Sequence, residues 1–593
     1  MRLKNMKQRF RSLLPEFIVG LALTLVITCF FWGSDNYKNR IVSSDGRGYY
    51  AYLPAVFIQQ DLSFQKTYEV EKKEFNNSFV PFYLIEGEDG RTFNKYYPGV
   101  AIMQTPFFLT AWLIESTYAD DITGYSMLFL KLLQLGSIFY ITLGFFFLRK
   151  YLNIVMKDKR SALLASIFIF IGTNVFFLVI VKTSFSHHLS FCLFAAFAYH
   201  IRMCLESERL KHIIYVGLIL GLITLVRPLN ILVIFAIPLI LGDWKNLKTF
   251  FTRLFQFSNG HLILSFLSFN AVIGFLFLLN FLQSGNIMNW SYDGEGFNFN
   301  EPHFWSLLFS YRIGIFVHAP LLLLSLIGCY FLFKKSKQTV AFWLAYLVII
   351  TYIMSCWWSW DYGGFYGNRV YSEHLVFFAL PLAYFFRDFK FRKVAVGLAA
   401  VFTLFMWSRA YQINAEITPS RFTQETFLKS MFRLDGTSKN DFAFVQDVKP
   451  HGFRTAKFIL NSEDKVPLEF DENREFGFIH KFEVPSEHAH NRYYFTTTIN
   501  KTLEPTSDLK DVFLIMDWYD TLSTHREYHS IPLYEYYKEG RGVAHELVIK
   551  QEQYLNPVSD LNFVNIYIWN PQEKEFTVNE FDILVEEYSQ HGK

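Results

Sequence analysis

Residues 125–148 read YSMLFLKLLQLGSIFYITLGFFFL, with Lys131 as their one charged side chain, and Arg149 and Lys150 follow directly. A helix needs roughly 20 apolar residues to cross the hydrocarbon core of a bilayer. The stretch is therefore predicted to be a transmembrane helix, and its basic flank marks the cytoplasmic end. The whole chain has 593 residues, of which 52% are hydrophobic and 18% charged. This composition is too apolar for an ordinary soluble enzyme.

Further apolar segments meet or approach the same length requirement, so we expect about eleven transmembrane helices. Together they define a helical membrane domain over residues 1–411. Residues 99–114 are also apolar, but Pro106 interrupts them and a polar loop precedes them, so we expect an interfacial helix there. Besides 125–148, the clearest spans are 13–32, 161–181, 262–282, 313–333 and 340–356, and the shorter or more polar ones are 188–203, 212–226, 229–241, 373–386 and 394–411.

The distribution of Lys and Arg orients these helices, because short cytoplasmic loops are enriched in basic residues. The N-terminus, MRLKNMKQRFR, is strongly cationic, and alternate loops are basic as well. The opposite loops, including the long first loop at 33–98, then lie outside. This alternation requires that 99–114 does not cross, and an odd number of spans puts the C-terminus outside. We predict a bacterial cytoplasmic (inner) membrane protein with a cytoplasmic N-terminus and an extracytoplasmic, or periplasmic, C-terminal domain.

The C-terminal region, residues 414–593, has a different character. Short runs such as FGFIHKFEV, RYYFTTTIN and DVFLIMDWY alternate apolar and polar residues between turn signals. This pattern is typical of an antiparallel β-sandwich or jelly roll. Such a domain commonly binds carbohydrate, although a passive cap on the membrane domain is equally compatible with the fold.

The sequence indicates no cofactor. Its 5 cysteines lie within or at the ends of predicted spans, so neither a disulfide framework nor a cysteine metal site is expected. The adjacent His187 and His188 have no further ligand at helical spacing, and we expect no metal site there. A divalent cation is compatible with the sequence without being indicated by it. No P-loop or Rossmann motif is found, and no nucleic-acid partner is expected.

Charged residues near membrane depth are costly, so each is a candidate for function. The stretch SSDGRGYY, residues 43–50, follows the first span and contains Asp45 beside glycines and aromatic residues. A carboxylate at the membrane face is suited to act as a general base toward a hydroxyl or amine acceptor. The alternative is an Asp that caps the following helix, since Asp is a favoured N-cap residue.

A second candidate is Arg227 in the stretch LVRPLN, which divides a long apolar region into two short helices. The break puts its guanidinium at the external end of a span, where the planar fork is suited to hold a phosphate. The alternative is an interfacial Arg that reaches toward lipid headgroups.

The third candidate is the loop WWSWDYGGFYGNR, residues 357–369. Trp358, Trp360 and Asp361 are suited to contact a sugar or an acceptor, and Arg369 offers a second guanidinium for an anion. The alternative for the aromatic residues is an ordinary belt at the membrane interface.

Further polar residues fall on the same predicted external face. Lys95, in NKYYPG, adds a positive charge to this face. Tyr49, Tyr97 and His187 are candidates for binding the sugar or the acceptor. The predicted site therefore draws on segments that lie far apart in the sequence.

Together these motifs resemble the GT-C superfamily of integral-membrane glycosyltransferases, the group that contains protein O-mannosyltransferases and aminoarabinose transferases. SSDGRGYYAYLPAVF resembles the first external loop, in which a catalytic acidic residue follows the first helix. NKYYPGVAIMQTPFF resembles the Tyr-Pro-Gly stretch before an interfacial helix, GLITLVRPLN the Arg-Pro segment, and WWSWDYGGFYGNR a loop of bacterial members. The resemblance covers about residues 10–410. The mannosyltransferases carry an adjacent Asp-Glu pair, whereas Gly46 follows Asp45, so Asp361 is the alternative base.

The resemblance implies a hexosyl- or pentosyltransferase with a polyprenyl-phosphate-sugar donor and a glycan, lipid or protein acceptor outside the cytoplasm. Asp45 would act as general base with inversion at the sugar carbon, while Arg227, Arg369 and Lys95 would neutralise the leaving phosphate. Two other classes stay open. A transporter or flippase of polyprenyl-linked glycans would show inverted repeats and broken helices, and a non-catalytic scaffold would only display a carbohydrate-binding domain.

Reporter fusions test the predicted orientation. Fusions after Lys157 and Lys335 should report the cytoplasm and fusions after Ser284 and Gln553 the outside, because the basic loops stay inside. A cytoplasmic signal after Gln553 would contradict the interfacial position of 99–114, since that segment would then have to cross.

Overall fold

The computed structural model describes residues 2–30, 38, 41–75, 83–87, 90–207, 211–256, 260–289, 291, 296–357, 359–362, 367–414, 427–428, 430–432, 453–460, 466–471, 474–483, 492–502, 512–520, 525–532, 546–555, 561–571 and 575–589. Contacts divide the chain into two compact units, Met1–Asn414 and Ala415–Lys593. The first unit is helical and the second is built from β-strands.

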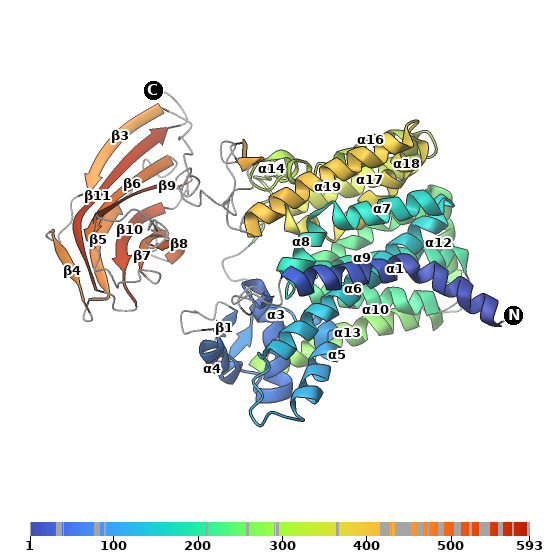
Figure 1. Ribbon diagram of the computed structural model, residues 1–593, viewed down its shortest axis with the longest axis horizontal. Coiled ribbons are helices and arrows are strands. Elements are labelled where there is room, and N and C mark those ends of the chain that lie inside the picture. Colours follow the sequence, from blue (N-terminus) through green and yellow to red (C-terminus); the bar gives the residue numbers. More distant parts are fainter. Residues whose placement is uncertain are drawn as a thin grey trace. The chain divides into compact units, whose positions relative to one another are not determined.

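The first unit is a bundle of helices that lie side by side, with a small cap of α3, α4 and a β1–β2 hairpin at one end (Figure 1). Several of its helices are broken or short. The elements are α1 (Arg2–Phe30), α3 (Asp45–Pro54), the π-helix η1 (Ala55–Gln59), α4 (Gln65–Glu74), β1 (Leu84–Glu86), β2 (Thr92–Asn94), α5 (Gly99–Glu115), α6 (Met127–Met156), α7 (Lys159–Ile171), α8 (Asn174–Val181), α9 (His187–Glu206), α10 (Lys211–Val226), the 3₁₀ helix η2 (Pro228–Ala236), α11 (Ile237–Leu241), α12 (Trp244–Gln256), α13 (Gly260–Ser284), α14 (Phe304–Phe309), α15 (Ile315–His318), α16 (Leu321–Phe333), α17 (Lys337–Ser355), the 3₁₀ helices η3 (Arg369–Tyr371) and η4 (His374–Phe378), α18 (Ala379–Asp388) and α19 (Arg392–Asn414).

Within the described residues, 5 helices are long and apolar enough to cross a membrane, or up to 7 spans if two bent helix pairs each count as one. The chain is therefore an integral membrane protein, but the eleven predicted spans are not shown. Breaks inside the apolar stretches shorten the helices: α10 ends at Val226 because Arg227 precedes a proline and is held extended. The long helices are Met127–Met156, His187–Glu206, Leu262–Ser284, Lys337–Ser355 and Arg392–Ile413, and the bent pairs are Lys159–Ile171 with Asn174–Val181 and Pro228–Leu241 with Trp244–Phe255.

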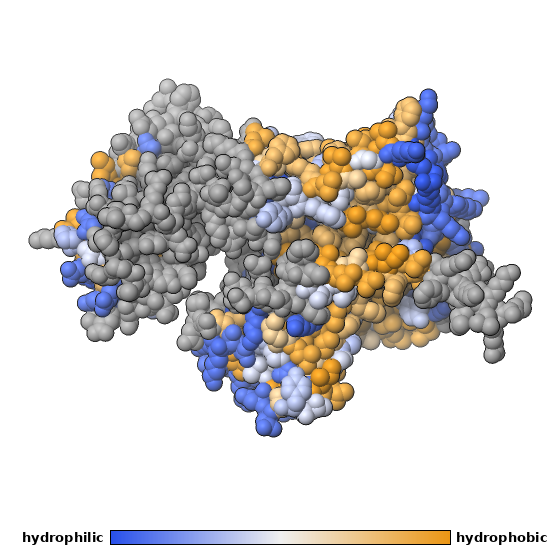
Figure 2. Space-filling model, in the orientation of Figure 1, coloured by the Kyte–Doolittle hydropathy of each residue, from blue (hydrophilic) through white to orange (hydrophobic). Residues whose placement is uncertain are grey.

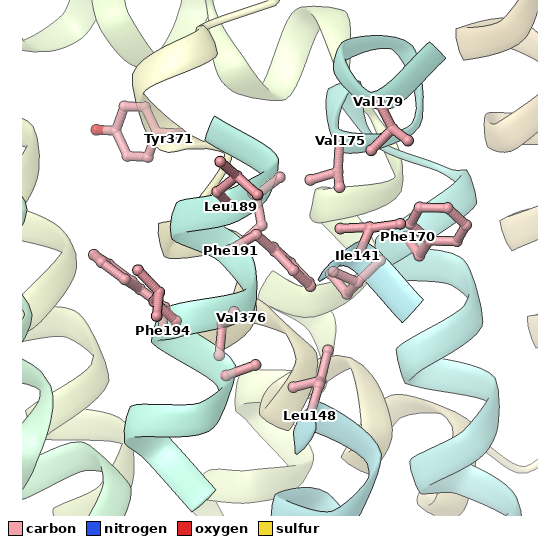
Figure 3. Packing of buried hydrophobic residues seen from close by; sticks show 14 of the residues in the cluster. Ile141, Leu148, Phe170, Val175, Val179, Leu189, Phe191, Phe194, Tyr371 and Val376 are labelled. Atoms are coloured by element: carbon pink, nitrogen blue, oxygen red, sulfur yellow. The ribbon is translucent and has the colours of Figure 1, made fainter. Parts of the chain in front are cut away.

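The surface and the interior of the bundle are both apolar. Figure 2 shows hydrophobic residues spread over the helices and hydrophilic ones gathered at their ends. Exposed side chains such as Phe266 and Phe281 of α13 suit contact with lipid tails. Inside, residues from α6, α7, α8, α9 and η4 meet in one cluster, which includes Ile141, Phe191 and Val376 (Figure 3).

An ion pair joins α1 to α6. Arg149 Nε donates to Glu16 Oε1 at 2.7 Å, and both side chains are largely buried. Helix α6 continues beyond the end of the predicted span 125–148 and includes Arg149. The side chain of Arg149 can therefore contact α1. A carboxylate within the first apolar run is costly by itself, and the guanidinium compensates its charge.

Helix α5, the predicted interfacial helix, contacts the first half of α6. Tyr140 Oη donates to the Met103 carbonyl at 2.5 Å, and the rings of Phe108 and Phe129 lie 4.7 Å apart. At the far end of α5, Glu115 accepts a hydrogen bond from Ser126, the residue that precedes α6. Along α5, from Met103 to Glu115, the contacting residues therefore move from the middle of α6 toward its first residue.

A buried carboxylate holds the cap together. Glu71 of α4 accepts hydrogen bonds from Tyr83 Oη and Tyr125 Oη, both at 2.7 Å. These bonds tie α4 to the hairpin and to the segment before α6. Beside them, the Arg47 guanidinium of α3 lies 4.4 Å from the centre of the Phe75 ring.

The second unit consists of antiparallel sheets, as the alternating pattern predicts. One sheet has the order β5-β10-β7-β8 and the other β3-β11-β6-β9, with β4 paired to β11. Side chains of both sheets share one hydrophobic cluster, in which Phe478 and Phe581 stack at 4.7 Å. The strands are β3 (Phe453–Leu460), β4 (Leu468–Phe470), β5 (Phe476–Glu483), β6 (Arg492–Thr502), β7 (Phe513–Asp520), β8 (His525–Pro532), β9 (Glu546–Leu555), β10 (Leu561–Trp569) and β11 (Phe576–Ser589).

Replacing Glu71 with Gln should destabilise the helical unit by about 1–3 kcal/mol, since a charged acceptor of two buried hydrogen bonds is lost. Thermal unfolding in detergent measures the effect. Glu69→Gln is the matched control: Glu69 lies on the same helix, its side chain is 62% exposed, and its surface pair with Lys72 contributes little. Equal melting temperatures for the two variants would contradict the role given to Glu71.

Candidate active site

Asp45 is the first residue of α3, and two glycines let the backbone around it pack closely. A Cβ at Gly46 would lie 1.8 Å from Ser184 Oγ, and one at Gly48 would lie 2.1 Å from Cδ2 of Tyr96. Ser44, directly before Asp45, has φ 48°, a left-handed conformation that non-glycine residues rarely adopt. Strain of this kind gathers at functional sites.

Both oxygens of the Asp45 carboxylate have partners. Arg369 Nη1 lies 2.9 Å from Oδ2, and Tyr96 Oη donates to Oδ1 at 3.0 Å. Burial by itself would raise the pKa of Asp45, but the charge of Arg369, the Tyr96 hydrogen bond and the charge of Arg227 together hold it below its ordinary value. The group is therefore an ionised carboxylate at neutral pH that faces cations, and these contacts differ from those of a helix cap.

Arg227 lies at the break between α10 and η2, where the following proline holds its backbone extended. Its Nη1 is 3.0 Å from His187 Nδ1 and 3.7 Å from Glu373 Oε1. Its side chain is 21% exposed, so the guanidinium belongs to a polar network inside the bundle. An Arg that only reaches toward lipid headgroups would not be held in this way.

Glu373, the residue before η4, was not among the candidates predicted from the sequence. Its side chain is 0% exposed. His187 Nδ1 lies 3.0 Å from Oε2, and Asn230 Nδ2 donates to Oε1 at 3.0 Å. A signal was present, because Glu373 opens the predicted span 373–386, but a carboxylate at the end of an apolar run is easily taken for an interfacial residue.

Lys182 and Tyr49 border the same cluster. Lys182 Nζ donates to Ser43 Oγ at 3.1 Å. Burial, followed by the charge of Arg369, lowers the pKa of Lys182 to about 8. The ring of Tyr49 packs against Tyr96 with 4.8 Å between the ring centres. The Asp45 carboxylate thus has cations and aromatic rings around it.

Other predicted residues lie elsewhere. Lys95 and Tyr97 line a hollow between the cap and the end of α13, and Tyr96 lines it too. Asp361, the alternative base, pairs with Arg312. The Trp360 ring stacks on His303 with 4.8 Å between the centres, whereas Trp358 lies outside the described residues. The cluster itself therefore consists of Asp45, Arg369, Arg227, His187 and Glu373, with Tyr49, Tyr96 and Lys182 at its border.

No family model matches the chain, and no curated protein matches it. Among solved structures it is similar to the oligosaccharyltransferase of Archaeoglobus fulgidus in complex with zinc and sulfate, with 14% identity and a TM-score of 0.39 over 72% of this chain and 58% of that one. It is also similar to oligosaccharyltransferase AglB from Archaeoglobus fulgidus in complex with an inhibitory peptide and a dolichol-phosphate, with 13% identity and a TM-score of 0.36 over 72% and 54% of the two chains.

The chain thus spans a little over half the length of these structures. The similarity is to an archaeal oligosaccharyltransferase. The narrower resemblance to protein O-mannosyltransferases and aminoarabinose transferases stays a prediction. At these scores the similarity carries no argument about chemistry, which has to come from the chain's own residues.

Proposed function

We propose that this protein is a membrane glycosyltransferase that moves a sugar from a polyprenyl-phosphate-linked donor to an acceptor on the extracytoplasmic side. The observation that carries the proposal is the ion pair of 2.9 Å between Arg369 and Asp45, with Arg227 close enough to act on the same carboxylate. A general base and two guanidiniums within one cluster are what transfer from a lipid phosphate needs.

The reaction begins when the phosphate of the donor binds to Arg369 and Arg227. The phosphate takes the place of Asp45 on Arg369, because guanidinium binds phosphate and carboxylate with the same planar geometry. Once Arg369 has turned to the phosphate, the pKa of Asp45 rises, since the charge that lowered it most has moved away. The carboxylate then becomes a stronger base when the donor is in place.

Transfer follows as a direct displacement. Asp45 takes the proton of the acceptor hydroxyl or amine, and the acceptor atom forms a bond to the anomeric carbon from the face opposite the phosphate. The bond between that carbon and the phosphate oxygen breaks, and its electron pair stays on the oxygen. Arg227 and Arg369 stabilise the charge that develops there, and the sugar carbon is inverted.

The proposed topology has about eleven spans, with the cluster facing outward and α5 at the interface. Short segments can cross if part of their length is 3₁₀ helix, which rises about 2.0 Å per residue against 1.5 Å in an α-helix. The 9 residues of η2 and 5 of α11 then reach roughly 25 Å, close to the hydrocarbon thickness of about 30 Å. The β-unit would lie outside and bind a glycan or the acceptor.

One observation favours a second function. Breaks such as the 53° bend between Lys159–Ile171 and Asn174–Val181, inside the predicted span 161–181, are also expected in a transporter of lipid-linked glycans. A transporter, however, has no need for a base, so the effect of changing Asp45 on bond formation separates the two functions.

Asp45→Asn should lower the rate of sugar transfer by roughly 10²–10⁴, the usual range for loss of a general base. Expression should change little, because the amide keeps the shape of the side chain. Binding of the donor lipid should not weaken, because the carboxylate charge that competes with the phosphate for Arg369 is removed. The measurement is single-turnover transfer from polyprenyl-phosphate sugars in nanodiscs. Near-normal turnover would remove Asp45 as the base and direct attention to Asp361.

Arg227→Lys and Arg369→Lys should weaken donor binding by roughly tenfold to a hundredfold and slow transfer, since Lys keeps the charge but lacks the planar fork. Gln at either position should cost more. Donor-lipid affinity and single-turnover rate are measured for each variant. If both Lys variants match the parent, any cation suffices and the two guanidiniums do not bind the phosphate.

A further inference from the structure

Glu373 carries a charge that the proposed chemistry does not use. Its side chain has no exposed surface, so it cannot touch a donor or an acceptor. Burying a carboxylate is costly unless hydrogen bonds and an opposite charge surround it. Glu373 has such surroundings, and two of the residues that supply them, His187 and Arg227, belong to the cluster.

Three side chains hold the Glu373 carboxylate. The amide of Asn230 donates to Oε1 at 3.0 Å and to Ser190 Oγ at 3.1 Å. His187 Nδ1 lies 3.0 Å from Oε2 and also 3.0 Å from Arg227 Nη1. An ionised carboxylate only accepts and a guanidinium only donates. Nδ1 therefore carries the proton and donates to Glu373, and Arg227 lies against the ring and is attracted by the carboxylate at 3.7 Å.

Arg227 is thus attracted by two carboxylates. It lies 3.7 Å from Glu373, and its charge also acts on Asp45. Asp45 already has Arg369 at 2.9 Å. If the charge of Glu373 were removed, Asp45 would still attract Arg227, and both guanidiniums would gather on the base.

We propose that Glu373 is a positioning residue that keeps Arg227 away from Asp45 and in the orientation in which it meets the donor phosphate. The inference rests on the proposed function. This role explains why the Glu373 carboxylate is buried beside the site, although Gly46 follows Asp45 where the mannosyltransferases have the second carboxylate of an Asp-Glu pair. Glu373 acts through Arg227 and touches no substrate.

Binding of a polyprenyl monophosphate in nanodiscs tests the inference without knowledge of the sugar. Glu373→Gln should weaken binding about tenfold or more, because Asp45 then competes for both guanidiniums. The loss should disappear when Asp45→Asn is added, since neither Glu373 nor Asp45 then attracts Arg227. The double variant should bind within about threefold of Asp45→Asn alone, which a double-mutant cycle reports as strong coupling.

Three further variants serve as controls for this experiment. Glu373→Asp keeps the charge but shortens the side chain, so it should weaken binding less than Glu373→Gln. Asn230→Ala loosens Glu373 without removing its charge and should give a smaller loss, again suppressed by Asp45→Asn; it serves if Glu373→Gln does not fold. Glu71→Gln changes an equally buried carboxylate in the cap and should leave binding by the folded protein unchanged.

The outcomes separate cleanly. Unchanged binding in Glu373→Gln would overturn the inference, and so would a loss that Asp45→Asn does not rescue, because a merely structural role predicts no rescue. A parent that does not bind polyprenyl monophosphate would contradict the proposed function itself and the inference with it. Loss in the single variant together with rescue in the double variant supports it.

Discussion

The site depends on a crossed pairing of charges made by one short segment. Residues 369–373 carry both Arg369, which pairs with Asp45 of α3, and Glu373, which attracts Arg227 at the start of η2. Buried charges are tolerated only where an opposite charge stands beside them. The segment therefore fixes where α3 and η2 can lie, because moving either one would leave a carboxylate or a guanidinium uncompensated. The 3₁₀ backbone of η4, whose five residues are all buried, is compatible with this position, since irregular backbone inside a membrane protein is tolerated where protein surrounds it.

Much of this arrangement was accessible from the sequence. Apolar runs indicated a membrane domain, and its described residues contain 5 long apolar helices, or up to 7 spans with the bent pairs. The composition change after residue 411 located the β-unit, and alternation predicted its antiparallel strands. Asp45, Arg227 and Arg369 were selected because charges near apolar runs are costly, and the structure brings them into one cluster. What these residues do stays a prediction.

The parts of the site that the sequence did not predict depend on how deep each side chain lies in the bundle and on the direction in which it points. Apolar runs encode neither of these. Lys95 and Asp361 fall on the same predicted face as Asp45, yet Lys95 lines a hollow beside α13 and Asp361 pairs with Arg312. Glu373 was overlooked because hydropathy scores a carboxylate at the end of a run as a boundary. The predicted number of about eleven spans was not shown either. Breaks at Arg227 and after Ile171 divide the apolar runs around them into helices that are too short to count as spans by length.

The ion pair between Glu16 and Arg149 has a consequence for biosynthesis. The two residues are separated by 133 positions, and translation adds about 5–20 residues per second. Glu16 therefore leaves the ribosome roughly 7–27 s before its partner. During that interval α1 contains an uncompensated carboxylate in an apolar segment, so water at the membrane surface has to solvate it. The first helix is thus expected to reach its final depth only after α6 has been inserted beside it.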